Sequence, residues 1–254
     1  MVVIAPGFVA ASVSSSALEQ EAKALMESGW WSDYSFNYTS FSYCEELTSI
    51  KCNDGRSVIG IIMYGVDLGD KVKKFNFSSF PNLVSLGLKN TGLRGSIPQE
   101  IGTLSKLTFL SLSQNNLTGE LSPSITNLTQ LEVFKISNNS ISGPIPDELG
   151  KLKNLYFLDL SYNNLTGSIP SILGLLSHNS LTGSIPSELF GDLPRLSHID
   201  LSYNYLTGNI PLSLSNINDL NLSNNSLEGR IPDDFKKFGL ATFIGNKNLC
   251  CDIK

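Results

Sequence analysis

The sequence predicts an α/β solenoid, a right-handed superhelix of about seven repeats of 24 residues whose strands form a concave parallel β-sheet. The first observation is a pattern, Leu-x-x-Leu-x-Leu-x-x-Asn-x-Leu-x-Gly-x-Ile-Pro, which recurs along most of the 254 residues. The second is its spacing, because copies begin at Leu107, Leu131 and Leu155, at intervals of 24 residues. A repeat of fixed period indicates coils that stack and share one core. Further copies begin at Leu83, Leu196 and Ile217.

Two leucines in each copy are two residues apart, which is the period of a β-strand. Leu110 and Leu112 are therefore expected to face the core, while Phe109, Ser111 and Ser113 face outward. One coil cannot bury its own leucines, but stacked coils can. The sequence predicts parallel strands near 85–89, 109–113, 133–137, 157–161, 198–202 and 219–223.

The asparagine of each copy must face inward, where a buried amide without partners costs roughly 1–3 kcal/mol. We therefore expect a ladder of amides that bond otherwise unpaired backbone groups at the strand ends. Its members are Asn115, Asn139, Asn163, Asn204 and Asn225, with Thr91 in the equivalent position of the first copy. The following glycine marks a tight bend. The proline then begins the convex side, where 146–152 is expected to form a short helical turn.

One coil is short, because Asn163 and Asn179 are only 16 residues apart. Gly174 then falls in the position of a core leucine, and glycine fills no volume. We expect an abbreviated or irregular strand at 170–179, a gap in the core, and weakly protected amides over 172–180.

The net charge of −5 and the dispersed charges exclude nucleic acid and anionic membrane surfaces as natural partners. No apolar run approaches the ~20 residues of a membrane helix, so we expect no membrane span in this chain. Residues 1–17 are apolar and then rich in Ser and Ala, which indicates part of a signal peptide, although the first basic residue is Lys23. We assign 18–82 to an N-terminal capping region, 83–232 to the repeats and 233–254 to an incomplete C-terminal cap.

Cysteines lie on both sides of the repeats and none within them. Solenoid ends need caps, and disulfides that staple them indicate an oxidising compartment. We expect Cys44 to pair with Cys52, whereas the adjacent Cys250 and Cys251 would strain a bond to each other, and their partners stay open. Secretion also makes sequons candidates for glycosylation. They are Asn37, Asn76, Asn116, Asn127, Asn138, Asn164, Asn221 and Asn224; Asn116 and Asn164 recur simply because the repeat does.

These residues resemble the extracellular domain of plant leucine-rich repeat receptor-like kinases. Leu-Thr-Gly-Ser-Ile-Pro, at 165–170 and 181–186, is typical of the plant extracellular repeat. Residues 21–31 resemble the family's N-terminal capping helix, and 245–250 resemble the start of its C-terminal cap. Residues 76–83 resemble the subgroup called MDIS-interacting receptor-like kinases. The resemblance covers about residues 18–251.

The chain departs from the family in two places. The family's cap reads Cys-x-Trp-x-Gly-Ile-x-Cys, whereas the segment from Cys44 to Cys52 is one residue longer and has Leu47 and Ser49 near the Trp and Gly positions. The resemblance then implies that the disulfide survives but the tryptophan packing does not. No Gly-rich phosphate loop, His-Arg-Asp or Asp-Phe-Gly motif is present, so we expect a non-enzymatic, truncated or secreted relative of a receptor ectodomain.

The outward strand residues are expected to form the binding surface. Seven coils at ~4.8 Å give a sheet of about 30 Å, which suits an extended peptide of about 9 or 10 residues. Phe157, Tyr162, His198 and Tyr203 are expected to cluster as aromatic anchors. The full set of ligand-binding candidates is Phe109, Lys135, Phe157, Asp159, Tyr162, His198, Asp200 and Tyr203.

Catalysis and cofactors are not expected. Asp159 and Asp200 hold the same repeat position two coils apart, roughly 10 Å, which exceeds the ~6.5–9.5 Å of inverting glycosidases. An open sheet also offers no pocket to raise a carboxyl pKa. His178 and His198 lack partners at metal-ligand spacing, so no zinc site is expected.

The sequence therefore favours extracellular recognition of a peptide or a partner protein, such as a co-receptor ectodomain, in receptor-type signalling at the cell surface or in the apoplast. One alternative is a secreted inhibitor of cell-wall-degrading enzymes, similar to polygalacturonase-inhibiting proteins, which binding to a fungal polygalacturonase would reveal. Another is an ectodomain fragment of a receptor serine/threonine kinase, which a downstream membrane helix and kinase motifs would reveal.

Overall fold

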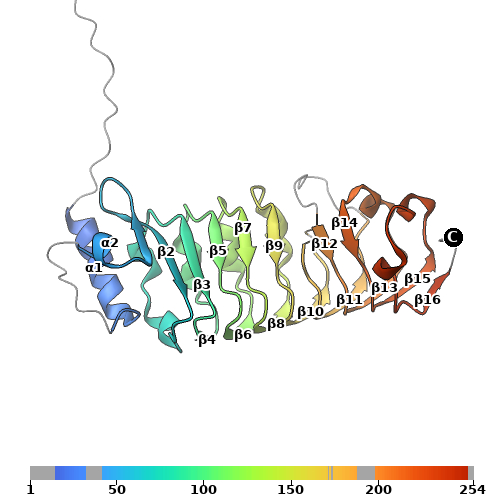
Figure 1. Cartoon of the computed structure of the whole chain (residues 1–254), viewed down its shortest axis with the longest axis horizontal. Helices are drawn as coiled ribbons and strands as arrows, with labels where there is room; N and C mark the ends of the chain where they lie inside the picture. The colour runs from blue at the N-terminus through green and yellow to red at the C-terminus, as the bar shows by residue number, and fades with distance from the viewer. Residues whose placement is uncertain (1–14, 33–41, 171, 173, 188–197, 251–254) are drawn as a thin grey trace, which may run out of the picture.

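The computed structural model describes residues 15–32, 42–170, 172, 174–187 and 198–250, which form one elongated solenoid (Figure 1). Helix α1 (Ser15–Ser28) lies across one end, followed by α2 (Tyr43–Glu46) and the antiparallel pair β1 (Ile50–Cys52) and β2 (Val58–Tyr64). Helix α1 therefore begins inside the segment assigned to a signal peptide, and residues 1–14 lie outside the described residues. Among the described residues, no helix is long and apolar enough to cross a membrane.

Apart from β1, which pairs antiparallel with β2 at one edge, the concave sheet consists of short parallel strands, one from each coil. Its first part has the order β1-β2-β3-β5-β7-β9, with β3 (Ser85–Lys89), β5 (Phe109–Ser111), β7 (Val133–Lys135) and β9 (Phe157–Asp159). Its second part pairs β12 (His198–Asp200) with β14 (Asp219–Asn221). The predicted strands are confirmed in place and direction, although most of them end two residues earlier than predicted. Leu86, Leu110 and Leu158 lie in register and are buried, as the period-2 pattern predicts.

A second parallel sheet follows the ladder asparagines, and its eight strands run in the order β16-β15-β13-β11-β10-β8-β6-β4. The repeat pattern predicts only a bend here. In the six strands other than the terminal β4 and β16, a leucine or isoleucine is buried and the glycine has a left-handed backbone, as at Gly119 with φ of 79°. The strands are β4 (Arg94–Gly95), β6 (Asn116–Glu120), β8 (Ser140–Pro144), β10 (Asn164–Ser168), β11 (Ser180–Ser184), β13 (Tyr205–Gly208), β15 (Ser226–Arg230) and β16 (Asn248–Cys250).

The convex side is built from short 3-10 helices. The predicted turn at 146–152 is confirmed as η6 (Asp147–Lys151), which buries Leu149 and follows Pro146 at its N-cap. Proline suits this place because its fixed φ prepares the turn and the first amides of a helix have no internal partner. The others within the described residues are η2 (Lys71–Lys74), η3 (Phe77–Ser79), η4 (Gln99–Thr103), η5 (Pro123–Asn127), η7 (Leu212–Asn216) and η8 (Asp233–Phe235). A further 3-10 turn, η9 (Leu240–Thr242), follows β14 on the concave side, where the Leu222 amide donates to the Thr242 carbonyl oxygen (2.8 Å).

The asparagine ladder is confirmed. Asn163 Nδ2 donates to the carbonyl oxygens of Ile136 (3.0 Å) and Leu160 (3.1 Å), and its Oδ1 accepts from the Ile141 amide (3.0 Å). Each amide thus joins its own coil to the coil before it. The same bonds recur at Asn115, Asn139, Asn204 and Asn225, and Asn179 and Asn246 extend the ladder. At the N-terminal end Thr91 Oγ1 donates to the Leu88 carbonyl oxygen (3.0 Å).

The short coil keeps an abbreviated strand, as predicted. Its contribution to the concave face is Leu175, which forms single bridges with Asp159 and Asp200 and so joins the two parts of the sheet. The second sheet runs through this coil without interruption, from β10 to β11 to β13.

The predicted core gap at Gly174 is wrong. A Cβ added to Gly174 would lie 2.6 Å from the Leu158 carbonyl oxygen and 2.8 Å from its Cβ. Leu158 therefore already occupies the space into which a side chain at 174 would extend. Ile172 and Leu176 on either side are buried, so the core continues.

A row of serines on the concave face is also more enclosed than the outward prediction implies. Strands ~4.8 Å apart leave a small side chain covered by its neighbours. Ser137 Oγ donates to Ser113 Oγ (3.1 Å), which shows how closely successive members approach. The buried members are Ser113, Ser137, Ser161, Ser177, Ser202 and Ser223.

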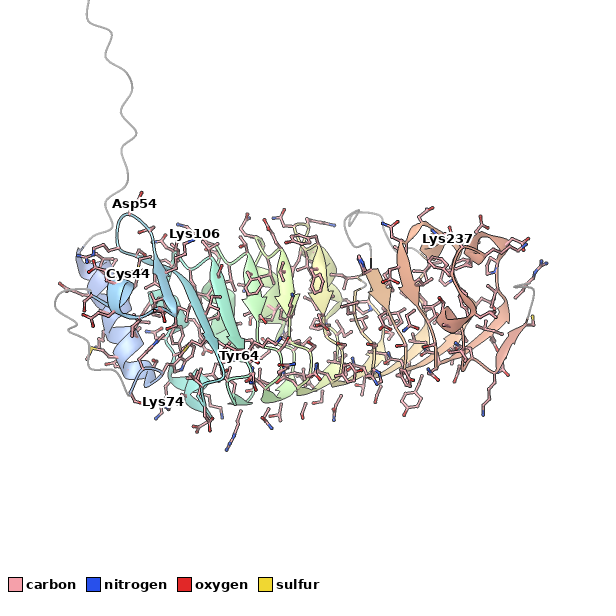
Figure 2. All side chains as sticks on the ribbon, viewed as in Figure 1. Cys44, Asp54, Tyr64, Lys74, Lys106 and Lys237 are labelled. Atoms are coloured by element: carbon pink, nitrogen blue, oxygen red, sulfur yellow. A yellow bond between two sulfur atoms is a disulfide. The ribbon has the colours of Figure 1, made fainter. Side chains whose placement is uncertain are left out.

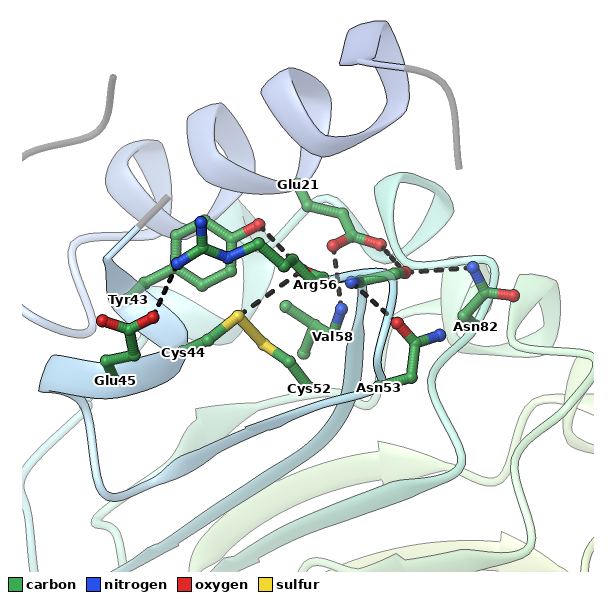
Figure 3. The surroundings of a disulfide bond; sticks show 10 residues. Glu21, Tyr43, Cys44, Glu45, Cys52, Asn53, Arg56, Val58 and Asn82 are labelled. Carbon is green, nitrogen blue, oxygen red and sulfur yellow. Dashed lines mark hydrogen bonds and ion pairs between the residues drawn. A yellow bond between two sulfur atoms is a disulfide. The ribbon is translucent and has the colours of Figure 1, made fainter. Parts of the chain in front are cut away.

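The N-terminal cap holds the predicted disulfide between Cys44 and Cys52 (Figure 3). Tryptophan packing is not lost, contrary to the expectation, because it comes from outside the cysteine loop. The Trp30 ring stacks on Phe75, with centroids 4.2 Å apart, and Trp31 Nε1 donates to Ser49 Oγ (2.9 Å). At the other end Cys250 is exposed in β16, while Cys251 lies outside the described residues.

Candidate functional site: the concave sheet

Side chains on the concave sheet form rows across the strands, because each parallel strand keeps register with the next. One row contains Ile62, Gly87, Ser111, Lys135 and Asp159. It continues beyond β9 through Leu175, Asp200 and Asn221. The row therefore changes character along the solenoid, from apolar to basic to acidic.

A hollow of about 430 Å³ lies over the N-terminal part of this face, from β2 to β9. Ile62 and Tyr64 line it and are 51% and 67% exposed, which is unusual for large apolar side chains on a folded surface. Tyr64 stands at the end of β2 (Figure 2). Sequence reasoning missed both residues because it placed β2 in the cap. The signal was present, because 58–66 reads as a strand immediately before the first repeat.

Gly87 shapes the floor of this hollow. A Cβ at Gly87 would lie 2.8 Å from Ile62 Cδ1 and 3.5 Å from Phe109 Cε1. The missing side chain lets Ile62 and Phe109 approach each other across β3. The result is an apolar platform, which we call the β2–β5 platform, made of Ile62, Gly87, Phe109 and Tyr64.

Two of the predicted ligand-binding residues form a pair beside this platform. Lys135 Nζ lies 4.4 Å from the centroid of the Phe157 ring, a favourable cation–π arrangement. The pair holds the ammonium group over β9, next to Asp159 in the following strand. Of the eight predicted residues, Phe109, Lys135 and Asp159 line the hollow.

Asp159 and Asp200 are held in the same way, two coils apart. Asp159 Oδ1 accepts from Ser161 Oγ (2.6 Å) and from the Ser161 amide (3.2 Å). Asp200 Oδ1 accepts from Ser202 Oγ (2.6 Å) and from the Ser202 amide (2.9 Å). Both carboxylates are thus oriented by a buried serine, with Leu175 between them.

The predicted aromatic cluster forms, but with different members. The His178 imidazole is stacked between Tyr162 and Tyr203, with ring centroids 4.1 Å and 4.2 Å apart and nearly parallel planes. All three precede a ladder asparagine and have left-handed backbones, with φ of 53–54°. Phe157 and His198, the other two predicted members, lie at the starts of β9 and β12, in a different row of the same face. His178 was missed because the short coil shifts it out of the 24-residue spacing.

A second hollow, of about 920 Å³, lies beside the N-terminal cap and is lined by Trp30, Trp31, Leu47 and Ser49. It also reaches Ile62 and Tyr64, so the two hollows meet at the β2–β5 platform. Within the described residues, no three His, Cys, Asp or Glu side chains gather closely enough to hold a metal ion.

The sequons differ in exposure. Asn37 lies outside the described residues. Asn221 and Asn224 are half-buried, and each is hydrogen-bonded to Ser223. The exposed candidates are Asn76, Asn116, Asn127, Asn138 and Asn164.

Comparison with known proteins places this geometry in a class. The family model for Leucine Rich Repeat matches residues 106–128, 130–152, 154–176, 195–217 and 216–238. Two Arabidopsis thaliana proteins are similar in sequence. The leucine-rich repeat receptor-like serine/threonine-protein kinase RGI4 is 44% identical over 80 residues, and the probable receptor-like kinase RPK1 is 31% identical over 109 residues. These matches cover 32% and 43% of this chain, but only 7% and 18% of those proteins.

Solved structures show the same likeness. The ectodomain of the Arabidopsis receptor kinase HAESA, in complex with the peptide hormone IDA and the co-receptor SERK1, is 40% identical, with a TM-score of 0.65. The match covers 70% of this chain and 31% of that one. The GASSHO1/SCHENGEN3 ectodomain from Arabidopsis thaliana, in complex with CASPARIAN STRIP INTEGRITY FACTOR 2, is 38% identical, with a TM-score of 0.65, over 68% of this chain and 22% of that one. A plant ice-binding protein is 25% identical, with a TM-score of 0.61, over 91% and 95%.

The chain is a leucine-rich repeat solenoid. More particularly, it is similar to the ectodomains of plant leucine-rich repeat receptor kinases, and it spans less than a third of the length of the receptor structures cited. The matches to the family model lie between residues 106 and 238. The resemblance to the MDIS-interacting subgroup stays a prediction.

Proposed function

We propose that this chain is an extracellular recognition module that binds an extended peptide along its concave sheet in receptor-type signalling. The observation that carries the proposal is the exposed β2–β5 platform and the hollow above it, with Lys135 and Asp159 at its far side. An exposed apolar patch with a few oriented polar groups is the usual form of a binding surface. A partner ectodomain is a second ligand for the same face.

Two further observations support this proposal. The Cys44–Cys52 disulfide is typical of proteins from an oxidising compartment, in agreement with an extracellular location. The receptor ectodomains that resemble this chain include complexes with peptide hormones. The ladder and the stacked coils also fix the sheet before any ligand arrives, so binding loses little entropy in ordering the protein.

The test is a selection of displayed peptides against the purified glycoprotein, followed by binding measurements on variants. Ile62→Glu and Phe109→Ala remove the platform without touching the buried ladder. Both should lower the affinity for selected peptides by about tenfold or more, since anchor residues typically contribute at least about 1.4 kcal/mol to the free energy of binding. Glu148→Lys, on the convex helix η6, is the matched control and should bind as the parent does. Equal binding by all variants would contradict the proposal.

Ice binding is a second candidate function, favoured by a specific array on the second sheet. The hydroxyl-bearing residue three positions after each ladder asparagine faces outward in five successive coils. The strands lie ~4.8 Å apart. Each array member is paired with the residue two positions before the next member, as Thr118 is with Ser140 and Thr166 with Ser180, so the array runs obliquely across the sheet and can hold water molecules at regular positions. The plant ice-binding protein is also similar over nearly its whole length. The array is Thr118, Ser142, Thr166, Thr182 and Thr207.

Inhibition of ice recrystallisation tests this candidate. Thr166→Lys and Thr182→Lys should abolish any inhibition, while Ile62→Glu should leave it unchanged. The protein is assayed with and without N-glycans, because the sequon residues Asn116 and Asn164 project from the same strands. A parent protein without activity in both forms eliminates the candidate.

A further inference from the structure

The three coils around the deletion form a distinct part of the concave face. Their first row is Asp159, Leu175 and Asp200, and their second row is Ser161, Ser177 and Ser202. Their third row is the stack of Tyr162, His178 and Tyr203. We infer that this face, which we call the acid–aromatic face, binds a polyproline II segment with two basic side chains three residues apart. The inference rests on the proposed function and names the class of peptide.

Charge complementarity selects the occupant. Lys89 and Lys135 lie on the strands of the N-terminal half of the sheet, whereas Asp159, Asp200 and Asp219 lie on those of the C-terminal half. A basic segment is therefore attracted to the C-terminal half and repelled from the N-terminal half. This difference in charge between the two halves determines which part of a long peptide binds the acid–aromatic face.

Spacing selects the conformation. Asp159 and Asp200 are separated by two strand spacings, roughly 9.6 Å. A polyproline II helix rises ~3.1 Å per residue with three residues per turn, so residues i and i+3 lie on one side, roughly 9.3 Å apart. In a β-strand, residues i and i+2 share a side but are only ~6.7 Å apart, and residues i and i+3 point to opposite sides. Among these regular conformations, only polyproline II presents both basic groups to both carboxylates.

The short coil provides the surface between the carboxylates. Leu175 is half-buried between Asp159 and Asp200 and offers an apolar contact to the two residues that separate the basic side chains. Proline rings at those positions suit it, because they are apolar and stabilise polyproline II. Tyr162 and Tyr203 are each about half exposed and lie in the third row, beyond the serines, where phenol hydroxyls can bond peptide carbonyl groups.

The probes are end-capped peptides that contain two arginines in a proline background. Pro-Pro-Arg-Pro-Pro-Arg-Pro-Pro has the matched spacing, and isomers with arginines two or four residues apart have the same composition and charge. We expect the matched peptide to bind the intact chain about tenfold more tightly than either isomer, because only it engages both carboxylates. Equal affinity for the three isomers would overturn the inference, and so would no measurable binding.

Variants identify the residues responsible. Asp159→Asn and Asp200→Asn keep an oxygen that accepts from Ser161 or Ser202, so the fold is retained while the charge is lost. Each should reduce the affinity of the matched peptide by about tenfold and remove the preference over the isomers. Asp147→Asn, on the convex helix η6, removes the same charge far from the sheet and should change neither. A loss as large in Asp147→Asn would show a response to net charge alone and overturn the inference.

The experiments distinguish failure of this inference from failure of the proposed function. If displayed peptides bind the β2–β5 platform but arginine spacing has no effect, the inference about the acid–aromatic face is wrong and the proposed function stands. If no peptide binds and the platform variants change nothing, both are wrong.

Discussion

An asparagine side chain joins each coil to the preceding one, so the ladder is the smallest unit that stabilises the fold. Asn163 makes bonds to three backbone groups and is buried. Asn163→Ala leaves those groups unpaired, and we expect it to lower the free energy of unfolding by ~1–3 kcal/mol. Thr166→Ala, an exposed residue in the same coil, is the control and should change it by less than ~0.5 kcal/mol. Denaturant melts provide the measurement.

Equal shifts for these two variants would mean that the ladder is not a stabilising element. Ser161→Ala would be a poor control. Ser161 is buried and donates to Asp159. Its loss should affect the orientation of that carboxylate as well as stability.

Glu21 joins helix α1 to the start of strand β2 (Figure 3). Its carboxylate accepts from Ser57 Oγ (2.5 Å) and from the Val58 amide (2.8 Å). Burial raises the pKa of Glu21 above its ordinary value of 4.5, and these two hydrogen bonds only partly oppose that rise. Burial and the charge of Glu21 raise the pKa of Tyr43 to about 12, so Tyr43 stays protonated in the same range.

The raised pKa of Glu21 determines how its contribution to stability changes with pH. The folded chain binds the Glu21 proton more tightly than the unfolded chain, so the contribution is fully present below about pH 4.5 and is lost as the pH rises through the raised value. The free energy of unfolding of the parent should therefore fall relative to Glu21→Gln between about pH 4 and about pH 7. Melts of both proteins across this range measure the difference. Parallel profiles would show that Glu21 does not titrate differently in the two states.

Sequence reasoning at the residue scale succeeded where the repeat dictates the chemistry. Asn115 and its equivalents must satisfy backbone groups, and the pattern shows which they are. It failed at His178 and Ile62, because neither has the expected spacing. The aromatic stack and the β2–β5 platform depend on which coils are neighbours. The sequence does not reveal this where a coil is shortened, or where the first strand lacks the repeat pattern.

Among the elements, the short coil departs most from the repeat. The amides of Leu175, Leu176 and His178 donate to the carbonyl oxygens of Leu158 (2.9 Å), Asp200 (2.8 Å) and Ser202 (3.0 Å). The coil has therefore closed against both neighbours. This bonding argues against the weak protection that sequence analysis expects over 172–180.

Hydrogen exchange should accordingly find the amides of Leu175, Leu176 and His178 protected to within about tenfold of those in 157–161, since both sets are bonded between coils. Leu175 provides the sharpest comparison, because it is the only bridge between the two parts of the concave sheet within the described residues. Exchange at the rate of an open loop would show that the coil is not closed.

Substitution of Gly174 tests whether the core of the short coil is filled or contains a cavity. Gly174→Ala would place a Cβ 2.6 Å from the Leu158 carbonyl oxygen, so we expect a loss of ~1–3 kcal/mol in the free energy of unfolding. Gly239 is the matched control, since a Cβ there meets nothing within 4 Å and its φ of −70° suits alanine. Denaturant melts compare the two. A stabilised Gly174→Ala would instead mean that a cavity exists and alanine fills it.

The second sheet shows what the repeat pattern predicts and what it leaves unpredicted. Each segment Leu-x-Gly marks a bend, and the sequence supports that reading. The strands arise because the ladder asparagine and the left-handed glycine orient the intervening residues identically in every coil. Parallel pairing then follows from stacking, which a single repeat does not reveal.

For the whole molecule, the sequence predicted the solenoid, the concave parallel sheet and the capping disulfide. Period and spacing determine these features, because a coil of 24 residues has little conformational freedom once it is stacked on its neighbours. The ligand is a different matter, because exposed residues are not constrained by packing. Phe109, Lys135, Asp159 and Asp200 were predicted as candidates from position alone, and their oriented contacts come from the structure.

The central claim is that the concave sheet, rather than the second sheet, is the binding surface. Hydroxyl-radical footprinting with a display-selected peptide tests it directly, because exposed tyrosines mark both faces. Tyr64, Tyr162 and Tyr203 lie on the concave side, and Tyr205 lies in β13 of the second sheet with 60% of its side chain exposed. The account predicts that bound peptide protects one or more of the first three and leaves Tyr205 unchanged. Protection of Tyr205 with no change at Tyr64, Tyr162 and Tyr203 would contradict it.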